Sequence, residues 1–535
     1  MRFTATFTAA LGLALAAPAF TQEAAQTAPA NTSEFHASNE FSLVSNAISG
    51  SGKDASSLTK GLKYLEILNL YGTGTRGAWN YNYTVGGKAT DDLRNDSKEL
   101  SLTNIQGRAT NNIHTITVGD VFESFSQYAL ATSLKGGSYR FLKENTKLPE
   151  VTAIMGWAYP RWDSVWKDPI TRTISRQAAG LRVKENINGD LWAGLSAVSA
   201  KDTGRLSATD PLYDAKNYTL DFNYIPMPGL TVAGEHSMSD YDEDTGATSE
   251  KGKATRIELV GDADPSRVSL EYENVEPDFY SALGSASPDR RKIKTKWRYK
   301  YTKQVTFTSG LLWYRNNLDG AKDGTTSNWK PEISAAIKRP FASRPYSFAD
   351  LSYKFDRKYG AGSSGADHYL NGNYRDRFGE LDSDTNLGYT LYRTKTGVRD
   401  AKEVNFNTSL NSRHQVKTVV LKPSVNLGTW YSKDELADET DKLYEYSLGL
   451  GFEAPDANLT SDLRFGQNML RKSASGTDDS DKFFAALNTY WRPKLMAKLN
   501  DSTIFLRAGF NNYAFTTTSR NFREKSVTVG INTAF

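Results

Sequence analysis

The sequence contains no cysteine among its 535 residues. Disulfide bonds, thiolate metal ligands, covalent haem attachment and lipid modification at a cleaved cysteine are therefore all excluded. Long apolar runs are also missing, because no stretch after the N-terminal segment approaches the ~20 apolar residues that a membrane-spanning helix requires. If the chain crosses a membrane, it must do so with strands. The formal net charge of only +4 gives no reason to expect a nucleic-acid partner.

The first residues have the pattern of a secretory signal peptide. Arg2 precedes an apolar run over residues 9–16, and Ala17-Pro18-Ala19 supplies a small-residue cleavage site. We expect residues 1–19 to be removed on export. Residues 20–40, rich in Ala, Thr, Gln and Asn, are expected to form a periplasmic tail, and the folded part is expected to span residues 41–535.

The rest of the chain alternates between apolar and polar residues. Mean hydropathy is −0.55, yet 28 Tyr and 25 Phe are present, which is typical of strands with one wet and one apolar face. From Phe41 onward the period is two, in segments of ~10 residues. Within 443–453, for example, Tyr444, Leu448 and Phe452 share one face, and segments 483–492 and 504–511 repeat the pattern.

Connections between these segments alternate in length. Short turns are expected near 186–190, 226–229, 262–266, 302–304, 411–414 and 453–458, and longer polar loops near 200–216, 238–252, 276–288, 316–327, 356–365, 430–440, 467–479 and 512–521. Short turns at one end and long loops at the other are the plan of an outer-membrane barrel. The sequence therefore predicts an all-β fold, a single large antiparallel transmembrane β-barrel of about 24–26 strands, with 26 favoured. Whether the first strand lies near Phe41 or near Ala78 stays open.

The last strand resembles the C-terminal signature of outer-membrane barrels, which end in Phe or Trp after alternating apolar residues. The residues that carry the resemblance are Val527, Val529, Ile531 and Phe535, with Thr533 as a departure from the usual large residue. The resemblance implies recognition by the barrel-assembly machinery. The alternative is an ordinary strand that happens to end in Phe.

A basic stripe is the most distinctive candidate for a pore lining. Its members alternate with apolar or aromatic residues over one strand: Lys292, Lys294, Lys296, Arg298 and Lys300. A column of cations on the inner face would lower the energy of anions in the pore. The alternative is a structural charge ladder, because Glu271 and Glu273 on the preceding strand are expected roughly opposite. Three more cations on another strand show the same tendency: Arg176, Arg182 and Lys184.

Residues 113–170 interrupt the regular alternation and contain glycines at which the chain could fold inward. The element Gly119-Asp120 followed by Phe122 and Phe125 resembles a GD-F-x-x-F element of outer-membrane barrel families over about 25 residues. We expect a lumen-facing or constriction segment here, with an irregular hairpin as the alternative. Its candidate residues are Asp120, Phe122, Glu123, Phe125 and Arg140.

Aromatic residues at 157, 159, 162 and 166 could stack on sugar rings, although an interfacial aromatic girdle is the more common meaning. The scattered histidines lack metal-ligand spacing, and no Ser, His and acid set suggests a catalytic triad. The sequence thus predicts neither an enzyme nor a bound cofactor or metal.

Two functional hypotheses follow. The first is a porin-like channel in the bacterial outer membrane for passive passage of small solutes, with a preference for anions if the basic stripe faces the pore. The second is a barrel sheath that encloses a partner, such as an electron-conduit cytochrome, or guides an exported polymer, because a pore this wide would leak if left open. Expected partners are outer-membrane lipid and lipopolysaccharide, the barrel-assembly machinery and, for the sheath, a periplasmic or lumen-filling protein.

Overall fold

A computed structural model describes residues 31–142, 148–165, 174–204, 210–244, 249–360, 364–394, 399–474, 476–496 and 502–535. Over these ranges the chain forms strands and single-turn 3₁₀ helices. No helix in the described ranges is long and apolar enough to cross a membrane. The expected signal peptide, 1–19, and most of the expected tail lie outside the described residues.

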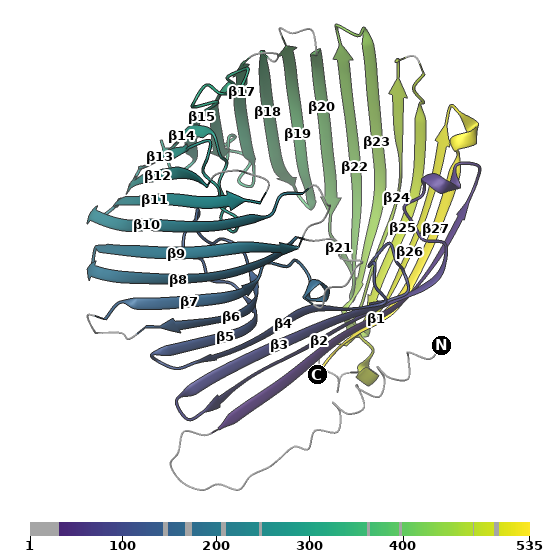
Figure 1. Cartoon of the computed structure of the whole chain (residues 1–535). Helices are drawn as coiled ribbons and strands as arrows, with labels where there is room; N and C mark the ends of the chain where they lie inside the picture. Colours follow the sequence, from purple (N-terminus) through teal and green to yellow (C-terminus); the bar gives the residue numbers. More distant parts are fainter. Residues whose placement is uncertain are drawn as a thin grey trace.

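The strands follow one another in chain order around the molecule (Figure 1). The first half comprises β1 (Thr32–Ser49), β2 (Gly61–Arg76), β3 (Trp79–Thr90), β4 (Leu100–Thr110), β5 (His114–Val121), β6 (Leu134–Phe141), β7 (Glu150–Trp157), β8 (Ser175–Asn188), β9 (Leu191–Gly204), β10 (Tyr213–Met227), β11 (Leu230–Glu243), β12 (Glu250–Ala263), β13 (Ser266–Val275) and β14 (Arg290–Lys300). The second half comprises β15 (Val305–Asn316), β16 (Ser327–Lys338), β17 (Phe348–Tyr359), β18 (Gly365–Phe378), β19 (Leu381–Thr394), β20 (Asp400–Ser412), β21 (His414–Val416), β22 (Val419–Asp434), β23 (Glu439–Ala454), β24 (Leu459–Lys472), β25 (Ser480–Trp491), β26 (Thr503–Phe515) and β27 (Phe522–Ala534). The 3₁₀ helices are η1 (Lys53–Ala55), η2 (Trp162–Ser164), η3 (Pro455–Ala457), η4 (Lys494–Met496) and η5 (Thr518–Arg520).

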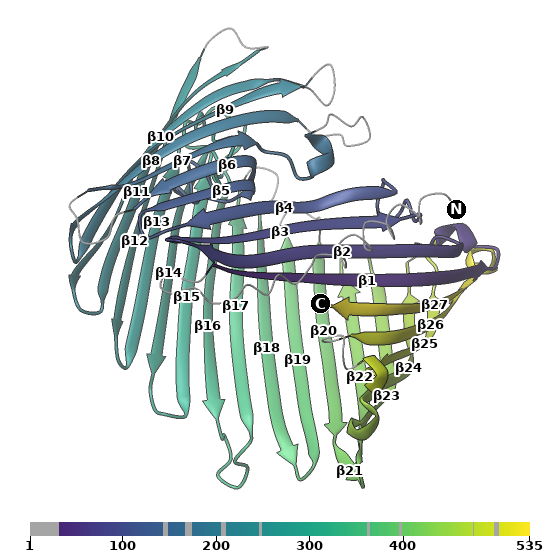
Figure 2. The ribbon, with the colours of Figure 1, turned by 90° about the horizontal axis from the view of Figure 1, so that it is seen from below.

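The sheet closes on itself as a single antiparallel barrel. β27 pairs with β1 from Ser38↔Ala534 to Ser49↔Arg523, and the two strands lie side by side in Figure 2. β20 and β21 both pair with β22 and share one place in the ring, so the barrel has 26 strands. The predicted fold class and the favoured strand number are therefore confirmed.

The strand that closes the ring against β27 is β1, which contains Phe41. The first strand therefore lies near Phe41 and not near Ala78. Its bounds also correct the expected boundary at residue 41, since β1 begins at Thr32 and Thr32–Glu40 pair with β2. The first residues of this stretch, Thr32–His36, extend past the end of β27. Polar Ser, Glu and His residues suit such a position, and they conceal the strand when the sequence is read for apolar alternation.

All connections fall at one of two ends. We call the end at which β1 begins and β27 ends the turn end, and the opposite end the loop end. Most turn-end connections are short, such as 77–78, 189–190 and 228–229, and most loop-end connections are longer. The separation by length is incomplete, because the loop-end connection 435–438 is short and the turn-end segment 492–502 is long.

Alternation gives the barrel two chemically different faces. On β23, Tyr444, Tyr446, Leu448 and Leu450 are exposed on the outer face, while Glu445, Ser447 and Gly449 lie on the inner one. Directly paired residues in an antiparallel sheet share a face, so the assignment extends from strand to strand around the ring. An apolar outer belt suits lipid, and a polar inner wall suits water.

The seam between β26, β27 and β1 is tightly packed at one glycine. A Cβ on Gly530 would lie 2.2 Å from the ring of Phe505, which is 1% exposed, and 2.7 Å from the Phe41 carbonyl oxygen. The glycine thus provides the space in which Phe505 packs against the closing strand. Gly509 on β26 also faces the lumen, but no atom lies within 4 Å of its Cβ position, so it offers a matched control.

We predict that Gly530→Ala destabilises the closed barrel by about 1–3 kcal/mol, because the added methyl group overpacks the seam. The temperature at which the purified barrel loses its folded mobility in gel electrophoresis should fall. Gly509→Ala should leave that temperature nearly unchanged. Equal behaviour of the two variants would contradict this account of the seam.

Candidate site in the barrel lumen

Two loop-end connections fold into the lumen, and we call them the first inward segment (122–133) and the second inward segment (276–289). They bond to each other through their backbones: Ala131 N donates to Leu283 O (2.9 Å), and Ser285 N donates to Gln127 O (2.7 Å). Their contact is so close at Gly284 that a Cβ there would lie 2.4 Å from the Tyr128 carbonyl oxygen. The segments therefore form one unit, although they are far apart in the sequence.

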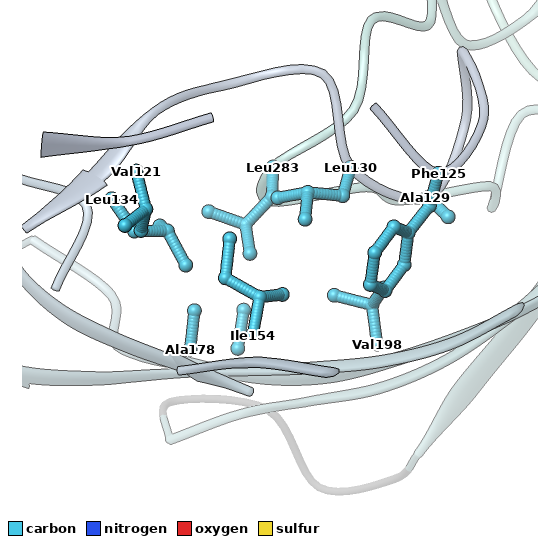
Figure 3. Packing of buried hydrophobic residues seen from close by; sticks show 10 residues of the cluster. Val121, Phe125, Ala129, Leu130, Leu134, Ile154, Ala178, Val198 and Leu283 are labelled. Atoms are coloured by element: carbon cyan, nitrogen blue, oxygen red, sulfur yellow. The ribbon is translucent and has the colours of Figure 1, made fainter. Parts of the chain in front are cut away.

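This unit packs on the inner wall through an apolar cluster (Figure 3). The cluster joins both inward segments to the inner faces of β5 to β9, and its members are Val121, Phe125, Ala129, Leu130, Leu134, Ile154, Ala178, Val198, Ala200 and Leu283. A second cluster holds Tyr128 and Phe279 against Ala254 and Val275. Burial of these apolar side chains favours the position of both inward segments inside the barrel.

Polar anchors satisfy the backbone of the first inward segment. Glu235 accepts hydrogen bonds from Tyr128 N (2.8 Å) and Gln127 N (3.2 Å). Arg182 donates to the Phe125 carbonyl oxygen and pairs with Asp221 (2.7 Å). A buried backbone group without a partner would cost several kcal/mol, so these side chains permit the loop to stay inside.

The second inward segment is anchored in the same way. Arg176 pairs with Asp202 (2.6 Å) and donates to the Ala282 carbonyl oxygen (2.9 Å). Tyr280 donates its backbone N–H to Ser239 (3.1 Å) and accepts at its carbonyl oxygen from Asn217 (2.9 Å). Arg176 and Arg182, noted in the sequence as further cations, are thus structural, and Lys184 lies over the Trp192 ring at 4.5 Å.

Tyr128 links the inward unit to the basic stripe. Its hydroxyl donates to Glu273 Oε1 (3.0 Å), and the side chain is fully buried. Burial raises the pKa of Tyr128, and the neighbouring Glu273 carboxylate raises it further, so the hydroxyl stays protonated. Lys292 pairs with Glu273 and with Glu271 (2.8 Å). Since Tyr128 lies in the lumen, Lys292 and Glu273 mark the lumenal face of β13 and β14.

The remaining stripe residues share this lumenal face with Lys292 because they occur at every second position. Lys300 pairs with Asp264 at the turn end (2.7 Å). Lys294, Lys296 and Arg298 are exposed, and none has a carboxylate within ion-pair distance in the described part of the chain. Glu332, two strands away in the same row, lies over Gly310 without reaching Lys296. The stripe therefore has ion pairs at its two ends, Lys292 and Lys300, and cations without carboxylate partners between them.

The five residues predicted for a constriction occupy different environments. Phe125 is 3% exposed in the apolar cluster, whereas Phe122 is 61% exposed. Glu123 accepts from Ser138 on the inner wall (3.0 Å), and Arg140 lies 4.0 Å from Glu150. Asp120 bonds to Lys135 and accepts from Trp162 Nε1 (2.8 Å) at the loop-end tips of β5 and β6. The structure brings Phe125 and Glu123 toward the lumen but leaves Phe122 outside the cluster.

The other predicted residues are dispersed. Trp162 covers the tips of β5 and β6, and the Tyr159 hydroxyl is hydrogen-bonded to Ser175 Oγ (2.5 Å). Trp157 lies on the outer face of β7, and Trp166 falls outside the described residues. Val527 and Val529 are exposed on the outer face of β27, with Ile531 below them. Phe535 exchanges backbone hydrogen bonds with Ala37 (2.8 and 3.2 Å).

Sequence reasoning missed the second inward segment, which it assigned to a polar loop near 276–288. The missed signal is the pair Phe279 and Leu283, two large apolar residues in a connection otherwise rich in Ser, Pro and Asp. Such residues would face water in an external loop, and Gly284, directly after Leu283, permits the close approach to Tyr128. No group of His, Asp and Glu side chains in the described ranges is arranged to hold a metal ion.

The sequence matches no protein-family profile and no curated protein. Among solved structures, the P pilus usher (PapC) translocation pore aligns with 93% of this chain and 99% of its own, at 10% identity and a TM-score of 0.37. OccD1 (OprD) aligns over 75% and 96% at 10% identity (TM-score 0.34), and the anion-selective porin from Comamonas acidovorans over 54% and 90% at 15% identity (TM-score 0.30). These likenesses concern the barrel architecture alone.

The fold is that of an outer-membrane β-barrel. The closed ring of strands and the apolar outer belt agree with such a fold. The barrel differs from a plain cylinder through its inward unit, which covers the inner wall from β5 to β14.

We predict that Arg182→Met loosens the first inward segment, because Asp221 and the Phe125 carbonyl group lose their buried partner at a cost of about 3–5 kcal/mol. Amide hydrogen exchange within 122–133 should accelerate by at least tenfold. Lys184→Met, the next inward cation on β8, removes a contact with Trp192 and a longer-range attraction to Asp221 but no hydrogen bond to the segment, and should leave that exchange unchanged. Equal protection in wild type and Arg182→Met would contradict the anchoring role.

Proposed function

We propose that the protein is a wide outer-membrane channel for small solutes and that it favours anions. The observation that carries this proposal is the group Lys294, Lys296 and Arg298, which faces the lumen without carboxylate partners in the described structure. Unpaired charge on a pore wall acts on passing ions, whereas charge held in an ion pair is largely neutralised. An anion near each cation gains about 1 kcal/mol at contact distance in water and more where water is scarce.

Amides and hydroxyls line part of the wall between β19 and β25. A recess of about 400 Å³ there is lined by Asn386, Asn407, Asn426, Ser447 and other residues, with Asp384 and Glu445 as carboxylates and Arg464 as a cation. Amides and hydroxyls hydrate a pore without selecting the sign of an ion. This recess carries more carboxylates than cations, so the proposed anion preference depends on solutes that pass beside the unpaired cations of the stripe on β14.

The inward unit supports a channel rather than a bare opening. It narrows the lumen beside β5 to β14, and the Lys292 end of the stripe contacts it through Glu273 and Tyr128. Solutes would pass between this unit and the polar wall, with Lys294, Lys296 and Arg298 further along toward the turn end. The unit would thereby reduce the leak expected of so wide a barrel.

We predict stable, open single channels when the purified protein is inserted into a planar lipid bilayer. The anion-to-cation permeability ratio, obtained from reversal potentials under a salt gradient, should exceed unity. Absence of conductance in folded, inserted protein would instead favour the alternative, a barrel that encloses a partner protein or guides a polymer.

We predict that Lys294→Glu, Lys296→Glu and Arg298→Glu together invert this selectivity, because the unpaired stripe then presents three carboxylates to the lumen. Arg291→Glu on the outer face of β14 is the matched control and should leave the ratio unchanged. A triple variant that conducts with unchanged selectivity would overturn the role of the stripe and leave the channel itself intact.

A further inference from the structure

A band of cations runs along the outer face at the loop end between β9 and β27, and we call it the cationic collar. Its members share the face of the apolar belt and lie within a few residues of their strands' loop ends: Lys201, Lys216, Lys253, Arg291, Arg315, Arg357, Arg393, Lys402, Lys433, Lys442, Arg471, Arg523 and Lys525. At the turn end, the outer face of the described strands carries Arg76 as its single Lys or Arg. The asymmetry points to a ligand that is present on one side of the membrane.

Some collar residues are held by neighbouring carboxylates. Lys201 pairs with Asp214 (3.2 Å), Lys402 with Glu435 (3.0 Å) and Arg471 with Asp481 (2.6 Å). Others have no carboxylate within ion-pair distance over the described ranges, and these include Lys216, Lys253, Arg315, Arg357, Arg393 and Lys525. Positive charge thus remains available along the collar.

The collar contains one shaped site. Arg357 on β17, Ala366 on β18 and Arg393 on β19 form a row of directly paired residues. Strand spacing places the two arginines about 10 Å apart, and the small Ala366 leaves room between them. They line a recess of about 400 Å³ together with Phe355, His368 and Asp400, the residue directly paired with Arg393 across β19 and β20.

Apolar surface begins directly below this recess. The next row holds Phe355, His368 and Leu391, and the row beneath it holds Tyr353, Leu370 and Tyr389. Tyr353, Leu370 and Tyr389 are exposed on the outer belt. A ligand that satisfies both levels must carry an anionic head at the height of the arginines and apolar chains that descend along the belt.

We propose that Arg357 and Arg393 bind a phosphate group of a phosphorylated lipid in the leaflet at the loop end. Guanidinium groups match phosphate oxygens through paired, charge-assisted hydrogen bonds. The acyl chains would lie against Leu370 and Tyr389, a contact that free inorganic phosphate cannot make. The rest of the collar would attract neighbouring headgroups through longer-range electrostatics.

The test is native mass spectrometry of the intact barrel in neutral detergent, titrated with a diphosphorylated glycolipid, a zwitterionic phospholipid or inorganic phosphate. Wild type should retain the glycolipid at low ratio, and Arg357→Ala with Arg393→Ala should weaken retention by about tenfold or more. Arg357→Lys with Arg393→Lys should retain an intermediate amount, because lysine keeps the charge but loses the planar fork.

The matched control is Arg464→Ala with Arg507→Ala, which removes two arginines from the inner wall and should leave lipid retention at the wild-type level. Folded gel mobility verifies that each variant is a closed barrel. Equal retention by wild type and the Arg357/Arg393 double alanine variant would overturn the proposal. Displacement of the glycolipid by equimolar inorganic phosphate would also overturn it, because the site would then bind a simple anion.

Discussion

The pairing of β27 with β1 is the constraint on which the rest of the structure depends. Inside a lipid layer no water is available to satisfy backbone groups, so each strand needs a neighbour on both sides. An even number of strands lets the last strand meet the first in antiparallel fashion, with the start of β1 and the end of β27 at one end of the barrel. Closure also fixes the two faces around the whole ring, because each pairing passes the orientation of its residues to the next strand.

The lumen, unlike the lipid face, can hold irregular backbone, as the inward unit demonstrates. A connection can leave the loop end and enter the barrel provided that its backbone groups find partners there. Glu235, Arg182 and Arg176 supply those partners, while Phe125, Leu130 and Leu283 bury apolar surface. Buried charges on the inner wall are therefore part of the packing of the loops, and the charges left unpaired, such as Lys294 and Lys296, are the ones available to solutes.

The sequence was sufficient for the fold because period-two alternation is a local property, repeated in every strand. It was insufficient where the environment depends on distant contacts. The start of β1 was missed since its first residues extend past the end of β27, where polar side chains obscure the pattern. The second inward segment was missed because its partner, the first inward segment, lies about 150 residues earlier in the chain, a separation at which hydrophobic periodicity carries no information. The pairing of Lys292 with Glu273 could be predicted, because the two residues lie opposite each other on neighbouring strands. The hydrogen bond from Tyr128 to Glu273 could not, because Tyr128 lies in a distant loop.

Register, rather than composition, decides what each charge does. Arg291 and Lys294 lie three residues apart on β14, yet one faces the outer belt near the loop end and the other faces the lumen. A formal net charge of +4 describes neither surface, because acidic residues concentrate on the inner wall and in the loops while cations form a band on the outer face. Two separate electrostatic surfaces therefore coexist on one sheet. A shift of β19 by one residue would turn Arg393 into the lumen, and it would also turn Tyr389 inward. The apolar belt that holds the barrel in lipid therefore also keeps the two sets of charges apart.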